Sequence, residues 1–181
     1  LLLDKKVTGL AYETLEKEGR LPLLAPMSEV AGRMAPIMAS LYLQKFRGGS
    51  GILPTGVSGV RPGKIVILGA GVVGTNAARV AVGLGMETVV INRAPAGLQR
   101  IDELFKGRVR TLPLSAHAVE EEVRDADMII GAVLAVAWTA AFVLSVLTFG
   151  LLAIPLGLGS LAFVILYDVL TIGGPNAGRA A

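Results

Sequence analysis

The chain has 181 residues and a formal net charge of +3, a length that suits one domain or one domain with an appendage. It contains no cysteine, which excludes disulfides, zinc sites built on cysteine and a cysteine nucleophile. Basic residues are scattered and aromatic residues make up only 5%, so the composition gives little support to nucleic-acid binding.

The first 47 residues mix short apolar runs with a helical pattern. Val7 to Tyr12 is β-branched and apolar, which predicts a strand, and Gly19 begins a predicted turn. Ser28 is expected to cap a helix whose apolar residues continue at helical spacing. Pro36 interrupts that pattern and is expected to kink or break the helix, because proline lacks the backbone N–H.

Residues 47–63 are rich in glycine and predict a flexible connector, after which strand-like and helix-like patterns alternate. The predicted strands are Lys64–Leu68, Thr88–Ile91, Arg108–Leu112 and Met128–Ile130, and the predicted helices are Val72–Leu84, Gly97–Phe105 and Val119–Arg124. This alternation predicts a parallel sheet with right-handed crossovers. The fold class is therefore α/β, a partial Rossmann-type doubly wound parallel sheet.

A G-x-G-x-x-G motif, Gly69-Ala70-Gly71-Val72-Val73-Gly74, follows the first buried strand directly and opens a helix. Gly69 permits the tight turn, and Gly71 lets the backbone approach a pyrophosphate. Gly74 lets helix and strand pack closely, and the helix N-terminus offers N–H groups to phosphates. The motif in this setting predicts a dinucleotide site.

The second strand of such a site normally ends on an acidic residue that binds the ribose, about 20 residues after the glycines. Here that position is Asn92, followed by Arg93. An asparagine can hydrogen-bond a ribose hydroxyl, and unlike a carboxylate it does not repel a 2′-phosphate. The positive charge of Arg93 could attract such a phosphate. The sequence therefore predicts NAD as the first choice of cofactor and leaves NADP open.

Several separated motifs together resemble the alanine dehydrogenase family in that family's order and spacing. They are Leu21–Met34, Gly48–Gly51, Gly56–Val60, Gly69–Ala78 and Asp125–Leu134. The resemblance covers residues 7–134. A more distant likeness is to the nucleotide-binding part of proton-translocating transhydrogenases.

The resemblance implies reversible oxidative deamination of L-alanine to pyruvate and ammonia with NAD, by an enzyme that is a homo-oligomer when complete. It implies cofactor contacts from a serine at Ser28, from the glycine loop, from the end of the second strand and from the end of the fourth. The expected cofactor-binding residues are Ser28, Gly69, Ala70, Gly71, Val72, Val73, Gly74, Asn92, Val133 and Leu134. The family usually has an acid where Asn92 stands and a basic residue near Gly97.

No residue of the chain is expected to be catalytic, because the family's substrate-binding Arg and Lys and its catalytic His match nothing after Leu1. The first residue is not methionine, and we expect the true N-terminus to lie upstream. The single histidine, His117, is interpreted as an exposed or half-buried loop residue. The run Glu120–Glu122 is interpreted as a solvated helix face rather than a metal site, since neighbouring helix residues point in different directions.

The end of the chain is unusually apolar, with no charged residue between Asp127 and Asp168. Residues 134–154 are long enough to span a bilayer core of about 30 Å. Three interpretations stay open: a transmembrane helix or hairpin, unrelated sequence joined by a frameshift or assembly error, and a buried element completing the sheet.

The predicted organisation is a remnant of a substrate domain and inter-domain helix at 1–47, a dinucleotide-binding Rossmann half at 48–134, and an apolar tail at 135–181. The leading hypothesis is a cytoplasmic, NAD-dependent oxidoreductase fragment that supplies cofactor binding. A rival hypothesis is a membrane-anchored nucleotide-binding subunit of a transhydrogenase-like system, and a third is a non-catalytic NAD-binding regulatory module. Retention on membranes after an alkaline wash would separate the first two.

Overall fold

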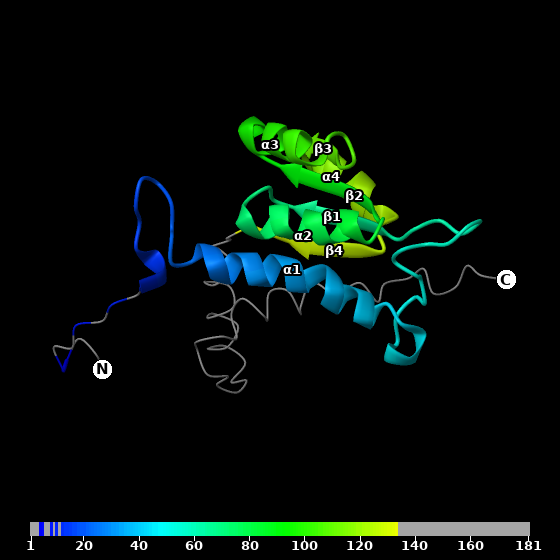
Figure 1. Ribbon diagram of the computed structural model, residues 1–181, viewed down its shortest axis with the longest axis horizontal. Coiled ribbons are helices and arrows are strands. Elements are labelled where there is room, and N and C mark those ends of the chain that lie inside the picture. Colours follow the sequence, from blue (N-terminus) through cyan, green and yellow to red (C-terminus); the bar gives the residue numbers. More distant parts are fainter. Residues whose placement is uncertain (1–3, 6–7, 9, 11, 134–181) are drawn as a thin grey trace.

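The structure is a computed structural model that describes residues 4–5, 8, 10 and 12–133. In chain order its elements are η1 (Tyr12–Thr14), α1 (Ala25–Tyr42), η2 (Lys45–Arg47), β1 (Lys64–Leu68), α2 (Val72–Gly83), β2 (Glu87–Asn92), α3 (Pro95–Phe105), β3 (Arg110–Pro113), α4 (Ala116–Arg124) and β4 (Met128–Gly131). Figure 1 shows the strands stacked as one sheet, with α1 lying along α2 and β4. From residue 64 on, every predicted strand and helix is confirmed, with boundaries shifted by at most three residues.

The four described strands form one parallel sheet in the order β3-β2-β1-β4. β1 lies at the centre, with Leu68 opposite Ile91 of β2 on one side and Gly131 of β4 on the other. This order places β2 and β4 on opposite sides of β1. The chain therefore adds β2 and β3 on one side of β1 and then crosses over to add β4 on the other side. Ligands of open α/β sheets bind at the carboxyl ends of strands at such a point.

Alternating residues of the strands face two different layers of helices. Ile65 and Ile67 of β1 pack with apolar residues of α1, α2 and α3 in one cluster. Val66 of β1 packs on the other face, in a cluster that includes Val119 and Val123 of α4. Both faces of the sheet are thus covered, which explains why the strands are apolar throughout rather than alternating with polar residues.

Helix α1 differs from the sequence prediction at its start and its middle. It begins at Ala25, and its N-cap is Leu24 with no capping side chain, so the prediction that Ser28 caps the helix is wrong. The helix also runs unbroken through Pro36, which is buried. Gly32, Ala35 and Ala39 on the same buried side bring α1 against α2 and the core, and this packing outweighs the backbone hydrogen bond that proline cannot donate.

The N-terminal segment is only partly described. The predicted strand from Val7 to Tyr12 is wrong at its end, where Tyr12 opens the 3₁₀ turn η1, and several of its other residues lie outside the described set. The turn at Gly19 is confirmed by a positive φ of 70° and by the bridge between Lys17 and Arg20. The predicted apolar tail also lies outside the described residues, and within them no helix is long and apolar enough to cross a membrane.

Candidate functional site

The turn that leaves β1 is built on Gly69, at the carboxyl edge of the sheet. Gly69 has a φ of 115°, which residues with a side chain rarely adopt, and its N–H donates to the Ile91 carbonyl at 2.8 Å. A Cβ at this position would lie 2.6 Å from the Ala132 carbonyl oxygen. The turn is therefore held closely between the ends of β2 and β4, as its predicted role requires.

Gly74 marks the contact between α2 and this turn. A Cβ there would lie 1.9 Å from the carbonyl oxygen of Gly69, far inside van der Waals distance. Only glycine permits the first turn of α2 to sit this close to the end of β1. The sequence prediction that Gly74 allows close packing is confirmed.

Gly71 differs from both of these glycines, because an added Cβ would meet no atom within 4 Å. It is the N-cap of α2, and as glycine it supplies no capping side chain. The N–H groups of the first helical turn therefore have no side-chain acceptor, which leaves them available to an anion. The surface at Gly71 is thus open to solvent and polarised positively at once.

Asn92, at the end of β2, bonds to the neighbouring loops rather than standing apart. Its Oδ1 accepts from the Ala70 N–H at 3.2 Å, and its Nδ2 donates to the Ala94 carbonyl at 2.9 Å. Gly97 leaves room for it, since a Cβ there would lie 2.5 Å from Nδ2. The side chain therefore ties the glycine turn to the start of α3.

Arg100 is a residue of this site that the sequence reasoning missed. Its guanidinium donates to the Ala70 carbonyl, so both backbone groups of Ala70 are held by β2 and α3. Gly97 already lies against Ala70, and Arg100 is three residues further along the same face of α3. That spacing is the one sequence signal that could have identified it.

The other predicted cofactor residues are placed less directly. Ser28 is half-buried on α1, one turn before Gly32, at which a Cβ would lie 2.3 Å from the Val73 carbonyl oxygen. Residues i and i+4 share a helix face, so Ser28 lies on the side of α1 that meets the start of α2. Val133 follows Ala132 at the end of β4 and is exposed, whereas Leu134 lies outside the described residues.

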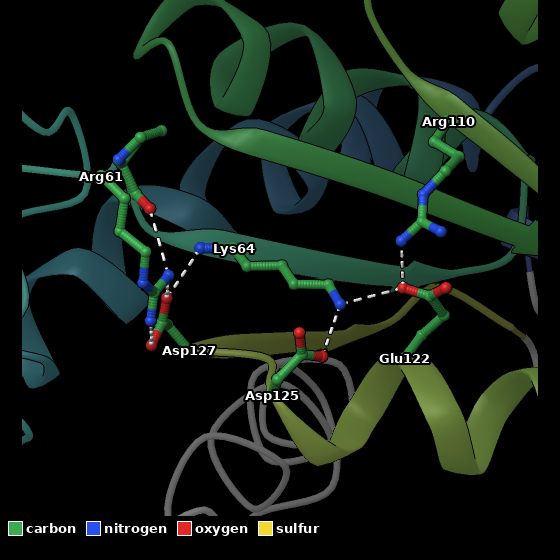
Figure 2. A network of polar contacts seen from close by, with 7 residues as sticks. Arg61, Lys64, Arg110, Glu122, Asp125 and Asp127 are labelled. Carbon is green, nitrogen blue, oxygen red and sulfur yellow. Dashed lines mark hydrogen bonds and ion pairs between the residues drawn. The ribbon is translucent and has the colours of Figure 1, made fainter.

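The opposite edge of the sheet, at the amino ends of the strands, carries a network of charged side chains (Figure 2). Lys64 of β1 is 5% exposed, and its ammonium lies 3.0 Å from Glu122 and close to Asp125. Arg110 of β3 also pairs with Glu122. The prediction that Glu120–Glu122 forms a solvated face is wrong for Glu122, which is buried because two cations from the sheet meet it.

The same edge holds a second ion pair, and its contacts shift the pKa values of Lys64 and Asp125. Arg61 pairs with Asp127 at 2.9 Å, and the same carboxylate accepts the Lys64 N–H at 2.8 Å. Burial by itself would lower the pKa of Lys64, but hydrogen bonds to Asp125 and Glu122 raise it overall. The hydrogen bond from Lys64 lowers the pKa of Asp125. Lys64 and Asp125 are therefore stabilised in their charged forms.

His117 lies in the first turn of α4 with its side chain 89% exposed, 3.7 Å from the carboxylate of Glu121. The exposure expected for this histidine is confirmed, whereas its expected place in a loop is wrong, because it lies within α4. His117 is far from the glycine turn in the sequence and belongs to another element. Its ionic partner Glu121 also lies on α4.

Comparison with known proteins gives a match to one family model. The model is "Alanine dehydrogenase/PNT, C-terminal domain", and it matches residues 35–147. That range contains β1 through β4 and thus the whole glycine turn with Asn92 and Arg100.

Curated alanine dehydrogenases match the chain over 134 residues. Those of Staphylococcus haemolyticus and Halomonas elongata are 51% and 52% identical to it, over 74% of this chain. The chain spans 36% of the length of each of these relatives. Their sequence identity is well above what the fold alone would require.

Solved structures give the same result. An L-alanine dehydrogenase superposes with a TM-score of 0.68 at 45% identity, covering 70% of this chain and 36% of that one. A transhydrogenase from Sinorhizobium meliloti reaches a TM-score of 0.50 at 22% identity, over 62% of this chain and 33% of its own length. The second likeness concerns the fold alone.

Proposed function

Because the chain belongs to the alanine dehydrogenase/PNT family, we propose that it binds a nicotinamide dinucleotide, NAD in the first place, on the turn Gly69–Gly74. The observation that carries this is the open surface at Gly71, beside an α2 N-terminus without a side-chain cap. Gly69 and Gly74 instead pack tightly, so the turn is rigid where it meets the protein and open where a ligand would lie.

The residues present fit such a group. The N–H groups of Val72 and Val73, in the first turn of α2 after an N-cap with no capping side chain, would hold the pyrophosphate. Asn92, at the end of β2, lies where the adenosine ribose binds in this fold. Ser28, Val133 and Leu134 are proposed as further contacts by family resemblance, Ser28 with the support of its position on α1 beside the first turn of α2.

In the complete enzyme we propose oxidative deamination of L-alanine to pyruvate and ammonia. NAD would supply the hydride acceptor for this reaction, and the chain's own residues would bind and orient it. We assign no catalytic role to any described residue. This polypeptide by itself is therefore expected to bind NAD without forming NADH when alanine is added, and a cytoplasmic location stays a prediction.

The neutral Asn92 and the neighbouring Arg93 support NADP as a second ligand of the same turn. A carboxylate at this position would repel a 2′-phosphate, whereas an amide does not. Arg93 is exposed directly after it. We therefore expect weaker discrimination between NAD and NADP than an acidic residue would give.

A calorimetric titration of the full chain with NAD tests the proposal, using two matched glycine variants on the same helix. Gly71→Ala adds a Cβ in open space at the proposed pyrophosphate site, and Gly83→Ala adds one in open space at the far end of α2. We expect Gly71→Ala to weaken NAD binding about tenfold, about 1.4 kcal/mol, and Gly83→Ala to leave it unchanged. Equal affinity in all three proteins, or no binding by any, would contradict the proposal.

A further inference from the structure

Arg100 of α3 is an exposed arginine whose guanidinium reaches back to the glycine turn and donates to the Ala70 carbonyl. Within the described residues it bonds to no other group and pairs with no carboxylate. The start of α3 lies close to the turn, since a Cβ at Gly97 would lie 3.2 Å from the Ala70 Cβ. A long charged side chain thus holds a single backbone oxygen.

That oxygen belongs to the same peptide as the Gly71 N–H. A trans peptide points its C=O and N–H groups in opposite directions. Arg100 therefore holds the oxygen toward α3, and the Gly71 N–H points away from α3. In the part of the chain that the structure describes this N–H has no acceptor, and the space beside Gly71 is open.

The peptide between Ala70 and Gly71 has few other restraints. Asn92 holds the preceding peptide, through the Ala70 N–H. The Thr75 Oγ1 lies 3.5 Å from the Ala70 oxygen, which is longer than an effective hydroxyl hydrogen bond. A reversal of the peptide would turn φ of Gly71 from −77° to a positive value, which glycine adopts readily.

We propose that Arg100 is a positioning residue for the dinucleotide, an inference that rests on the function proposed for the turn. By holding the Ala70 oxygen toward α3, it keeps a negative oxygen away from the pyrophosphate and presents the Gly71 N–H instead. An ionised donor suits this task, because its hydrogen bonds are about twice as strong as neutral ones. Without Arg100 only a fraction of the chains has the binding orientation, and the apparent affinity falls by that fraction.

The chain offers a matched control at the other end of α2. Arg108 is also exposed and donates to the Val82 carbonyl at 3.1 Å, so it too holds one backbone oxygen. Calorimetric titration of the full chain with NAD compares Arg100→Met with Arg108→Met at a temperature where both are folded. We expect Arg100→Met to weaken NAD binding about tenfold, and Arg108→Met to leave it unchanged. Equal losses in both variants would show a merely structural role and overturn the inference.

Rescue by a shorter cation tests the donor itself. Arg100→Lys keeps a positive charge and can still donate one hydrogen bond to the Ala70 carbonyl, so it should recover most of the NAD affinity that Arg100→Met loses. A lysine variant that binds NAD as weakly as the methionine variant would contradict the role of this hydrogen bond.

A double variant separates positioning from direct contact with the ligand. Gly71→Ala makes the reversed peptide inaccessible with or without Arg100, because alanine rarely adopts a positive φ. Arg100→Met added to Gly71→Ala should therefore weaken NAD binding by less than about twofold further. A further loss of about tenfold would show that Arg100 contacts the ligand itself, and would overturn the positioning role.

NADP gives an independent check, because both dinucleotides carry the pyrophosphate on which positioning acts. Arg100→Met should therefore lower the two affinities by the same factor, and a larger loss for NADP would show direct binding of the 2′-phosphate and overturn the inference. If the wild type binds NAD and Arg100→Met binds it as tightly, the inference fails and the proposed function stands. A wild-type chain that binds no NAD overturns both.

Discussion

The two edges of the sheet are built in opposite ways. The carboxyl edge is formed by backbone, with three glycines and an α2 N-terminus whose first N–H groups have no capping side chain. The amino edge is formed by charged side chains that pair with one another, with Lys64 and Glu122 both buried. One edge thus leaves polar groups for a ligand, whereas the other uses its polar groups to hold the protein together.

This difference separates binding from stability within one small sheet. Asn92 and Arg100 fix the backbone of Ala70 from outside, so the turn keeps its shape without filling its open side. Lys64 and Glu122 instead join β1 to α4, across the layer formed by Val66 and Val119. Changes on the open side of the carboxyl edge, at Gly71, should alter ligand affinity alone, whereas changes at the amino edge should alter the free energy of unfolding and leave affinity unchanged.

The largest expected effect is that of Gly74→Ala, which breaks the carboxyl edge itself. The new Cβ meets the Gly69 carbonyl at 1.9 Å, so α2 must move away from the turn. We expect the free energy of unfolding to fall by about 3 kcal/mol, and NAD binding to be lost with it. Urea unfolding and NAD titration measure the two effects, with Gly83→Ala as the control that keeps both.

The next effect concerns the amino edge alone. Glu122→Leu leaves the Lys64 ammonium buried with only the exposed carboxylate of Asp125, and should cost about 2 kcal/mol of unfolding free energy. NAD affinity should stay within twofold of the wild type. The double variant Lys64→Met/Glu122→Leu should regain most of the loss, because no buried charge is then left unpaired.

Loss of NAD affinity in Glu122→Leu, at a temperature where the variant is folded, would show that the two edges are coupled. A double variant as unstable as the single one would show that the pairing of Lys64 with Glu122 is not the cause. Either result would contradict the division of roles between the edges.

A smaller effect is expected from Asn92→Asp, which sharpens the account of the carboxyl edge. The carboxylate can still accept from the Ala70 N–H, although it loses the hydrogen bond that Nδ2 donates to the Ala94 carbonyl. Its charge should lower NADP affinity relative to NAD about tenfold, about 1.4 kcal/mol. Titrations with both dinucleotides measure the ratio, and an unchanged ratio would show that position 92 does not face the 2′-position.

The smallest effect is a dependence of stability on acid pH. Because Lys64 lowers the pKa of Asp125, this carboxylate stabilises the fold above its unfolded pKa and ceases to do so as pH falls through its folded pKa. The midpoint of urea unfolding should therefore fall as pH drops below about 4, the ordinary pKa of an aspartate. Asp125→Asn should fall less steeply over that range, and equal slopes would contradict the pairing.

The sequence was sufficient to predict the features that depend on local pattern. The apolar run Lys64–Leu68 followed by G-x-G-x-x-G predicts a strand, a tight turn and a helix, because each of those residues has a steric role within a few positions. The parallel sheet follows from the alternation of strands and helices. The position of Asn92 at the end of β2 follows in the same way.

Features that depend on distant partners were not predictable in this manner. The sequence around Pro36 predicts a kinked or broken helix. The packing of α1 on α2, which keeps the helix continuous, is a tertiary property that the local pattern does not contain. Glu122 looked solvated because its partners Lys64 and Arg110 lie on other strands. The only local sign of its burial is that Glu122 shares a helix face with Val119, which packs on the sheet.

The central claim is that the backbone at the start of α2 binds the dinucleotide, and amide chemical shifts measured during an NAD titration of the labelled full chain test it most directly. We expect the largest shifts at the N–H groups of Val72, Val73 and Gly74, with little change at Lys64 and Glu122. Shifts confined to the amino edge, or none at the α2 N-terminus at saturating NAD, would contradict the account.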